Sequence, residues 1–302
     1  MVGTPVMIPW KVLANEQSSM DMIIGRTDPE FDTEFRSECN SRAIYTDALP
    51  ASNGTGGVYM IPLSDSEDKI VFKPQSEENE STGGNGFVKE YAAYLIDRGL
   101  SSVPETFITT INFKGAPSVL GSMQRFVKDS VDAEDYGPSR FNTEDIHRVG
   151  ILDVRILNTD RHSGNLMLNT VTGKVIPIDH GSAFPTLSNL QDISFEWLSY
   201  PQAKEPFSEA LLADIEGINV FKDISILQQL DFDIHTISAV FAATMLLKIY
   251  AKSGKNLYEI GSVLQRANDR TEPSRFEKLL SDAYLMHGSL ATNFTTVVNM
   301  TL

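Results

Sequence analysis

The sequence predicts an α+β protein with two lobes, the first rich in strands and the second mostly helical. Up to about residue 127, short apolar runs alternate with glycine-containing and polar turns, a pattern typical of strands. Beyond residue 140, apolar residues recur at helical spacing, and Asn or Asp precedes several of these stretches. The predicted division is an N-terminal extension at 1–40, a first lobe with its connecting segment at 41–127, and a second lobe at 128–302.

Composition and charge restrict the classes of partner. The 302 residues suffice for one large or two ordinary domains, and the net charge of −15 disfavours nucleic acid and passive adsorption to anionic membranes. The single cysteine, Cys39, allows no internal disulfide and is typical of a reducing compartment. The N-terminus lacks a secretory pattern, and the longest apolar run, Ala239–Leu247, is shorter than the ~20 residues of a membrane span. We therefore expect no transmembrane segment and a cytoplasmic location, with a nuclear one or peripheral membrane contact left open.

The first lobe is expected to open with a glycine loop between two strands. Residues 1–40 are weakly patterned and read as an extension that is packed on this lobe or partly loose. Arg42–Thr46 and Val58–Ile61 are strand-like. Glycine amides in the loop between them can approach phosphate closely, although by itself such a loop is more often a simple hairpin turn. The candidate phosphate-binding residues are Asn53, Gly54, Thr55, Gly56 and Gly57.

A lysine and a glutamate follow the glycine loop. In the predicted strand Lys69–Pro74, Ile70 and Phe72 share one face, and Lys73 lies on the other. After the polar, glycine-rich stretch 75–86, which we expect to be a mobile loop, residues 87–96 show helical spacing. Glu90 on this helix is the candidate ion-pair partner of Lys73, and a solvated glutamate is the alternative.

A further strand, an apolar run and a polar segment lead to the second lobe. Residues 107–113 are predicted to form a strand, and Ser118–Val127 is an apolar run that becomes an extended linker. The acidic stretch Lys128–Arg140, with its Gly-Pro pair, is expected to be a surface loop. Asn142 or Thr143 then caps a helix whose buried stripe holds Ile146, Val149, Leu152 and Ile156.

The segment after this helix carries the candidate chemistry. Two apolar runs, Leu166–Leu168 and Val175–Ile178, flank a glycine turn and predict a β-hairpin, so that Asp160, Asn165 and Asp179 can share one small volume. Two carboxylates and an amide oxygen suit Mg²⁺, which leaves coordination positions open for phosphate. Phosphoryl transfer needs such a set. A solvated acidic loop is the alternative.

The motif order is that of kinases, and its details resemble one family. Asp160-x₄-Asn165 precedes Asp179-His-Gly181, but Asp-Arg-His replaces the usual His-Arg-Asp. The run Arg155–Asn165 and the Asp-His-Gly sequence resemble the phosphatidylinositol 3-/4-kinase superfamily, and most of all the plant-type gamma phosphatidylinositol 4-kinases, also called ubiquitin-like-domain kinases. The resemblance extends over roughly Tyr45 to Met286.

The resemblance implies a bilobal protein-kinase-like fold with ATP and Mg²⁺, or Mn²⁺, as cofactors. Lys73, braced by Glu90, would neutralise phosphate charge, while Asn165 and Asp179 would hold the metal. Asp160 would orient the acceptor hydroxyl. The remaining implied roles are stabilisation of the leaving charge by Arg161 or His162 and adenine binding by the backbone of Gln124, Arg125, Phe126 and Val127.

The acceptor implied by the family name is the 4-hydroxyl of phosphatidylinositol. Residues 182–208 contain one basic residue, Lys204, instead of the Arg and Lys cluster that a phosphorylated headgroup requires. A protein serine/threonine kinase of the same fold is the alternative, and an inactive ATP-binding regulator is a third reading. The aromatic residues of this segment are candidates for lipid contact, although such residues are more often core: Phe184, Phe195, Trp197, Tyr200 and Phe207.

The remainder of the chain is predicted to be helical. Asp233 caps a helix over Ile234–Lys252, which Gly254 ends. Two further helices are expected over residues 257–266 and 273–287.

Overall fold

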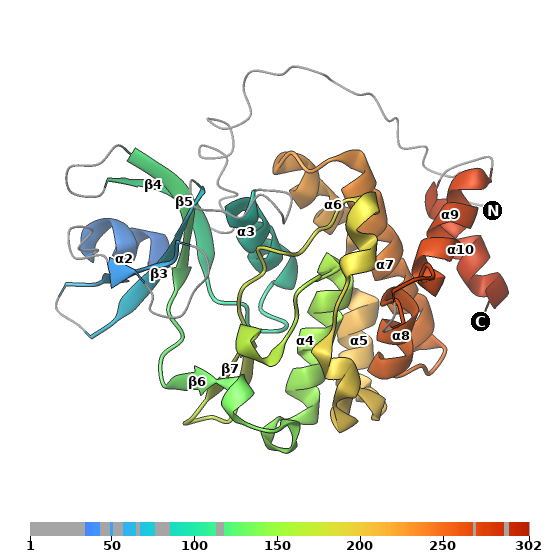
Figure 1. Ribbon diagram of the computed structural model, residues 1–302, viewed down its shortest axis with the longest axis horizontal. Helices are drawn as coiled ribbons and strands as arrows, with labels where there is room; N and C mark the ends of the chain where they lie inside the picture. The colour runs from blue at the N-terminus through green and yellow to red at the C-terminus, as the bar shows by residue number, and fades with distance from the viewer. Residues whose placement is uncertain are drawn as a thin grey trace.

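The computed structural model describes residues 34–42, 49–50, 57–64, 67–75, 85–112, 118–267, 270–286 and 290–301. The larger sheet lies in one lobe and most of the helices lie in the other, so the predicted two-lobed α+β fold is confirmed (Figure 1). The predicted loop residues Asn53, Gly54, Thr55 and Gly56 lie outside the described residues, as do most of the predicted strand at 42–46 and of the polar stretch at 75–86.

The described strands of the first lobe form one antiparallel sheet in the order β1-β2-β3-β5-β4. Ile70 and Phe72 of β3 are fully buried and Lys73 lies on the opposite face, as predicted. The strands are β1 (Leu49–Pro50), β2 (Tyr59–Pro62), β3 (Lys69–Pro74), β4 (Thr106–Asn112) and β5 (Ser118–Arg125).

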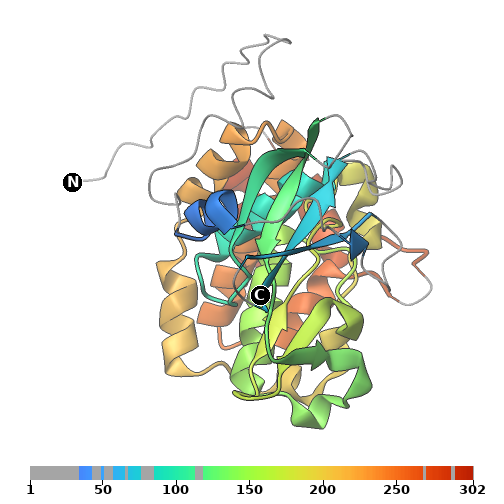
Figure 2. The same cartoon turned by 90° about the vertical axis from the view of Figure 1, so that its left-hand side faces the viewer.

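A helix that the sequence pattern did not indicate, α2 (Glu34–Arg42), packs beside this sheet (Figure 2). Phe35 and Cys39 are buried, and Arg36 donates to the Ile108 carbonyl at 3.0 Å. Burial raises the pKa of the Cys39 thiol to about 12, which keeps the thiol protonated. The predicted domain boundary at residue 40 falls inside this helix, so α2 belongs with the first lobe.

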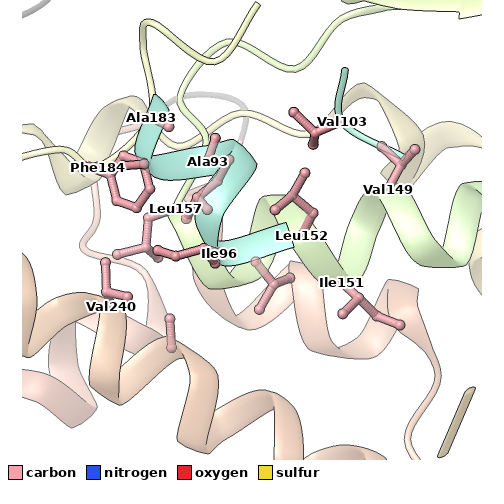
Figure 3. Packing of buried hydrophobic residues seen from close by; sticks show 14 of the residues in the cluster. Ala93, Ile96, Val103, Val149, Ile151, Leu152, Leu157, Ala183, Phe184 and Val240 are labelled. Atoms are coloured by element: carbon pink, nitrogen blue, oxygen red, sulfur yellow. The ribbon is translucent and has the colours of Figure 1, made fainter. Parts of the chain in front are cut away.

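The predicted helix around Glu90 is α3 (Gly86–Asp97), and it lies between the sheet and the helices of the second lobe (Figure 1). Ala93 and Ile96 of α3 join one hydrophobic core with Leu157, Phe184 and Val240 of the second lobe (Figure 3). The core is therefore continuous across the two lobes under α3.

In the second lobe, α4 (Thr143–Ile156) leads into the predicted hairpin of β7 (Leu166–Asn169) and β8 (Val175–Pro177). The side chain of Asn142 accepts from the Glu144 amide and caps α4, which confirms the predicted helix start. Residues 128–140 are not wholly a loop: β6 (Ser130–Asp132) pairs with β7, because the hairpin edge offers free backbone groups to an adjacent strand.

The described helices that follow pack around α7, whose bounds match the prediction. Asp233 caps α7 by accepting from the amides of His235 and Thr236. Among the described helices, α7 is long and apolar enough to cross a bilayer, but 67% of its apolar window is buried inside the protein, as in a core helix. The helices are α5 (Glu209–Gly217), α6 (Val220–Gln229), α7 (Ile234–Lys252), α8 (Leu257–Leu264), α9 (Arg275–Leu285) and α10 (Leu290–Thr301).

The aromatic residues of segment 182–208 belong to the core. Trp197 is 1% exposed and stacks on Phe195, with ring centroids 4.7 Å apart. All the aromatic residues considered for lipid contact are buried, namely Phe184, Phe195, Trp197, Tyr200 and Phe207. Lipid contact through these rings is therefore ruled out, because their faces are already covered.

The buried histidine of α4 predicts a pH dependence of stability. His147 Nε2 lies 2.8 Å from the Gln202 carbonyl oxygen, and the ring meets Phe207 edge-on. Burial lowers the pKa of His147 below its ordinary 6.5 although the Gln202 carbonyl opposes this. The neutral ring thus stabilises the fold above pH 6.5, and this stabilisation is lost as the pH falls lower.

We expect the melting temperature to decrease as the pH falls below 6.5, and less steeply in a His147→Gln variant. Thermal unfolding across this pH range measures both slopes. The matched control is His235→Gln, which alters an exposed residue of α7 and should leave the wild-type slope. Equal slopes in the two variants would contradict the assignment.

Candidate active site

Lys73 joins the two lobes through two carboxylates. Its ammonium contacts Glu90 of α3 and lies 3.0 Å from Asp179 Oδ1. Burial lowers the pKa of Lys73, but Asp179 and Glu90 outweigh it, so the net pKa lies above its ordinary 10.5. Burial likewise raises the pKa of Glu90, yet Lys73 and His180 outweigh it and hold that pKa well below 4.5. The predicted pair forms and stays charged at neutral pH.

Asp160 and Asn165 lie together on the loop after α4. The Asn165 side-chain Nδ2 donates to the Asp160 carbonyl at 2.9 Å, and the Asn165 carbonyl accepts from the Ile178 amide. This second bond ties the loop to the strand that delivers Asp179. The Asp160 carboxylate is 57% exposed and the Asp179 carboxylate 52%, so both are open to an incoming ligand.

The oxygen donors fit a hard divalent cation. Because Asn165 Nδ2 is engaged with Asp160, the amide oxygen is the atom directed elsewhere, and Asp179 supplies an exposed carboxylate. Asp179 adopts φ +55°, a left-handed conformation that costs energy for a residue other than glycine and often occurs at functional positions. Among the described residues, no group of three or more His, Cys, Asp or Glu side chains is placed to hold a metal ion.

Arg161 has a structural role in the loop after α4. Its side chain is fully buried, and Nε donates to both oxygens of Asp153 at 3.1 Å. Nη1 contacts the carbonyls of Asn165 and Ile178. The guanidinium therefore holds the loop and the strand that precedes Asp179 together. A role of Arg161 in stabilising a leaving charge stays a prediction.

His162 is the exposed neighbour of Asp160. Its Nδ1 accepts from the Gly164 amide at 3.1 Å, which leaves Nε2 directed toward Asp160 Oδ1, 3.9 Å away. A role of His162 near the acceptor stays a prediction.

The segment predicted to bind adenine lies at the end of β5. The Arg125 amide donates to the Glu105 carbonyl at 2.8 Å, and the Gln124 side chain donates to Thr106. The Arg125 amide is therefore not free for a base, because β5 is an inner strand. Phe126 and Val127, beyond the strand, stay predicted adenine contacts, and Gly57 is the one predicted loop residue that is described.

An open pocket of about 740 Å³ adjoins Asp160. Residues 194–196 pair with the loop that carries Asp160. The Arg161 amide donates to the Ser194 carbonyl, and the Glu196 amide donates to the Arg161 carbonyl. The Gln265 side chain accepts from the Phe195 amide at 2.6 Å, which holds the end of α8 against residues 194–196. The lining combines carboxylates, hydroxyls and apolar groups: Asp160, Arg161, His162, Ser194, Phe195, Glu196, Leu198, Ser199, Tyr258, Ser262, Gln265, Arg266 and Ala267.

Two buried residues near the site, His180 and Asp153, have no role assigned from the sequence. His180 is 0% exposed, with Nδ1 3.5 Å from Glu90 Oε2. Asp153 accepts from Arg161, Asn158 and, at 3.0 Å, the Trp197 indole. An aspartate inside an otherwise apolar helix stripe was the available signal for Asp153, because a buried carboxylate needs partners.

A strand-rich lobe, a helical lobe and a Lys–Glu pair facing an Asp, Asn and Asp set define a protein of the bilobal kinase class. Residues 18–256 match the family described as "Phosphatidylinositol 3- and 4-kinase". The chain therefore belongs to the phosphatidylinositol 3- and 4-kinase family.

Named relatives come from plants. Phosphatidylinositol 4-kinase gamma 1 of Arabidopsis thaliana is 33% identical over 74% of this chain and 47% of its own length. Phosphatidylinositol 4-kinase gamma 4 of Oryza sativa subsp. japonica is 34% identical over 77% of this chain and 47% of its own length. The chain thus spans about half the length of these curated relatives. A solved structure, the Helicobacter pylori proinflammatory kinase CtkA, aligns with a TM-score of 0.38 at 15% identity, over 70% of this chain and 92% of that one.

Proposed function

We propose that this chain transfers the γ-phosphoryl group of ATP to the 4-hydroxyl of phosphatidylinositol. The observation that carries the proposal is the contact of Lys73 with both Glu90 and Asp179, next to the loop that carries the exposed Asp160 and that the Asn165 carbonyl ties to the Ile178 amide. Asn165 completes the set. These are the side chains that phosphoryl transfer requires on the two sides of a nucleotide cleft.

Each side chain has a distinct role. Lys73, held by Glu90, binds the nucleotide phosphates as a point charge. Asp179 and Asn165 would hold Mg²⁺ or Mn²⁺, which when bound neutralises phosphate charge. Asp160 accepts the hydrogen bond of the acceptor hydroxyl, orients its oxygen toward the phosphorus and takes up its proton as general base. The buried Arg161 keeps these groups at a fixed separation.

The pocket beside Asp160 supports an acceptor without additional phosphates. Both of its guanidinium groups are already engaged: Arg161 with Asp153, and Arg266 with Glu277. A phosphorylated headgroup would lack free cations there, whereas hydroxyls of a neutral inositol ring can hydrogen-bond to Ser, Tyr and Gln side chains. The relatives are named for phosphatidylinositol 4-kinase activity, which agrees with this choice.

A protein serine/threonine acceptor is the second candidate, because acidic groups surround the catalytic loop. Glu134 Oε2 lies beside Gly164, at 3.0 Å from the position that a Cβ on this glycine would occupy. Glu196 lines the pocket. Together with the net charge of −15, these carboxylates favour a basic peptide over an anionic leaflet. An inactive ATP-binding regulator is the weakest candidate. Such a protein is expected to lack at least one of four side chains that are all present here, namely Lys73, Asp160, Asn165 and Asp179.

We also propose a cytoplasmic location with peripheral membrane contact, since a lipid acceptor must be reached at a bilayer surface. Fractionation of cells that express the full chain tests this proposal. Recovery with integral membrane proteins after a carbonate wash would contradict it.

The proposed function is tested by incubating the protein with labelled ATP, Mg²⁺ and either phosphatidylinositol vesicles or a mixture of basic serine-containing peptides. We expect label in the lipid at the 4-position, and no label with Asp179→Ala. Label in peptides alone would select the second candidate. Equal labelling by wild type, Asp160→Asn and Asp179→Ala would remove the basis for both, because the assembled side chains would not be used.

A further inference from the structure

A buried cluster of three charges lies outside the candidate active site, where α3, α4 and α6 meet. Asp223 of α6 accepts from Arg98 at 2.9 Å through Oδ1 and from Arg155 at 2.7 Å through Oδ2. The side chains of Asp223 and Arg155 are 1% and 3% exposed. Isolated buried charges are costly, so each carboxylate oxygen is matched to one guanidinium.

This ion cluster holds the C-terminal end of α3. Arg98 is the C-cap residue of α3, and Arg155 Nη2 also donates to the Ile96 carbonyl at 3.0 Å. Arg98 adopts φ +49°, a conformation that glycine usually supplies at a helix end. An arginine at this strained position indicates that its side chain is needed there.

The same helix carries Glu90, two turns before the cluster. A helix is rigid over about 12 Å, the length of the eight residues from Glu90 to Arg98. Most of α3 is buried, and Ala93 and Ile96 pack on the second lobe (Figure 3). A displacement of the clamped end would therefore move Glu90 relative to Lys73 and Asp179.

We propose that Asp223, through Arg98 and Arg155, is a positioning residue that fixes α3 so that Glu90 meets Lys73 without any activating input. The inference rests on the proposed phosphotransferase function for its kinetic consequence, but not for its structural one. Asp223 lies on α6, far from the catalytic loop in sequence, and touches no predicted nucleotide or metal contact. It acts only through α3.

The charges around the cluster explain why Asp223 is the central member. Two guanidinium groups face one carboxylate. Burial lowers the pKa of the nearby Lys248 of α7, and Arg155 acts in the same direction, whereas Glu216 and Asp223 raise this pKa. Removal of the Asp223 charge would leave several cations facing one another. Arg98 is 27% exposed, so its removal is milder and leaves Asp223 paired with Arg155.

The experiment compares four folded variants by hydrogen exchange of α3 amides and by steady-state kinetics. Asp223→Asn and Arg98→Met are expected to speed exchange in the C-terminal half of α3 and to lower kcat/KM for ATP by about 2- to 30-fold, the range for residues that couple to a distant site. KM for the acceptor should not change. Arg98→Lys keeps the charge and should retain most of the wild-type behaviour.

Leu279→Ala is the matched control, since it removes buried apolar contacts in α9 and lowers the melting temperature without touching α3. If Asp223→Asn does not fold, Arg98→Met decides the outcome. Unchanged α3 exchange in folded Arg98→Met, or the same α3 response in Leu279→Ala, would overturn the inference. If α3 exchange is faster in these variants but the wild-type protein shows no phosphotransfer, the positioning role of Asp223 stands and the proposed function is refuted instead.

Discussion

Replacement of Asp160 by asparagine is expected to lower kcat by about 10²- to 10⁴-fold, the usual contribution of a positioned general base. The amide keeps the size of the side chain but cannot accept a proton from the acceptor hydroxyl. Because Asp160 is exposed and does not contact Lys73 in the described hydrogen bonds, KM for ATP should change little. ADP release and formation of the phosphorylated acceptor, followed in single-turnover and steady-state experiments, give both constants.

His162→Gln serves as the neighbouring control, because it alters an exposed side chain of the same loop without removing a carboxylate. Its kcat should stay within about tenfold of wild type if Asp160 is the base. A larger loss in His162→Gln than in Asp160→Asn would transfer the proton-accepting role to the histidine.

Replacement of Asp153 by alanine is expected to cost about 3–5 kcal/mol of unfolding free energy, as for other broken buried ion pairs. Asp153 and Arg161 are both fully buried, and the alanine would leave the guanidinium without its carboxylate. The Trp197 indole and Asn158 would lose their acceptor as well. Urea denaturation monitored by tryptophan fluorescence measures the loss, and activity should fall with it because the catalytic loop is no longer held.

An exposed ion pair provides the comparison. Asp192 and Arg270 lie 3.8 Å apart, with side chains 47% and 54% exposed, so Asp192→Ala should cost less than about 1 kcal/mol. Similar costs for Asp153→Ala and Asp192→Ala would show that the buried network adds nothing to the stability of the fold.

Local patterns in the sequence were enough to predict much of the first lobe and the hairpin. Alternation in β3 set which face Lys73 occupies, and Asn142 and Asp233 marked the starts of α4 and α7. The spacing of Asp160, Asn165 and Asp179 around a hairpin predicted that they come together. Each of these depends on residues close in the chain, where side-chain direction follows from backbone geometry.

Other features were not predictable in this way. Helix α2 is polar apart from Phe35 and Cys39, and its few buried side chains gave no periodic signal. The amide of Arg125 looked available for adenine until strand pairing placed it opposite Glu105. β6 was read as part of a loop because three residues carry too little pattern to reveal a strand.

The sequence by itself determined most of the elements, their faces and the candidate site residues, because these follow from neighbours within a few turns or strands. Only the tertiary structure decided which charged side chains form the ion pairs that hold the fold together. Arg161 is buried on Asp153, Lys73 reaches Asp179 across 106 residues, and Arg98 reaches Asp223 across 125. Such pairings depend on how whole lobes pack, since burial fixes which charged groups must find a partner and which stay free for a substrate.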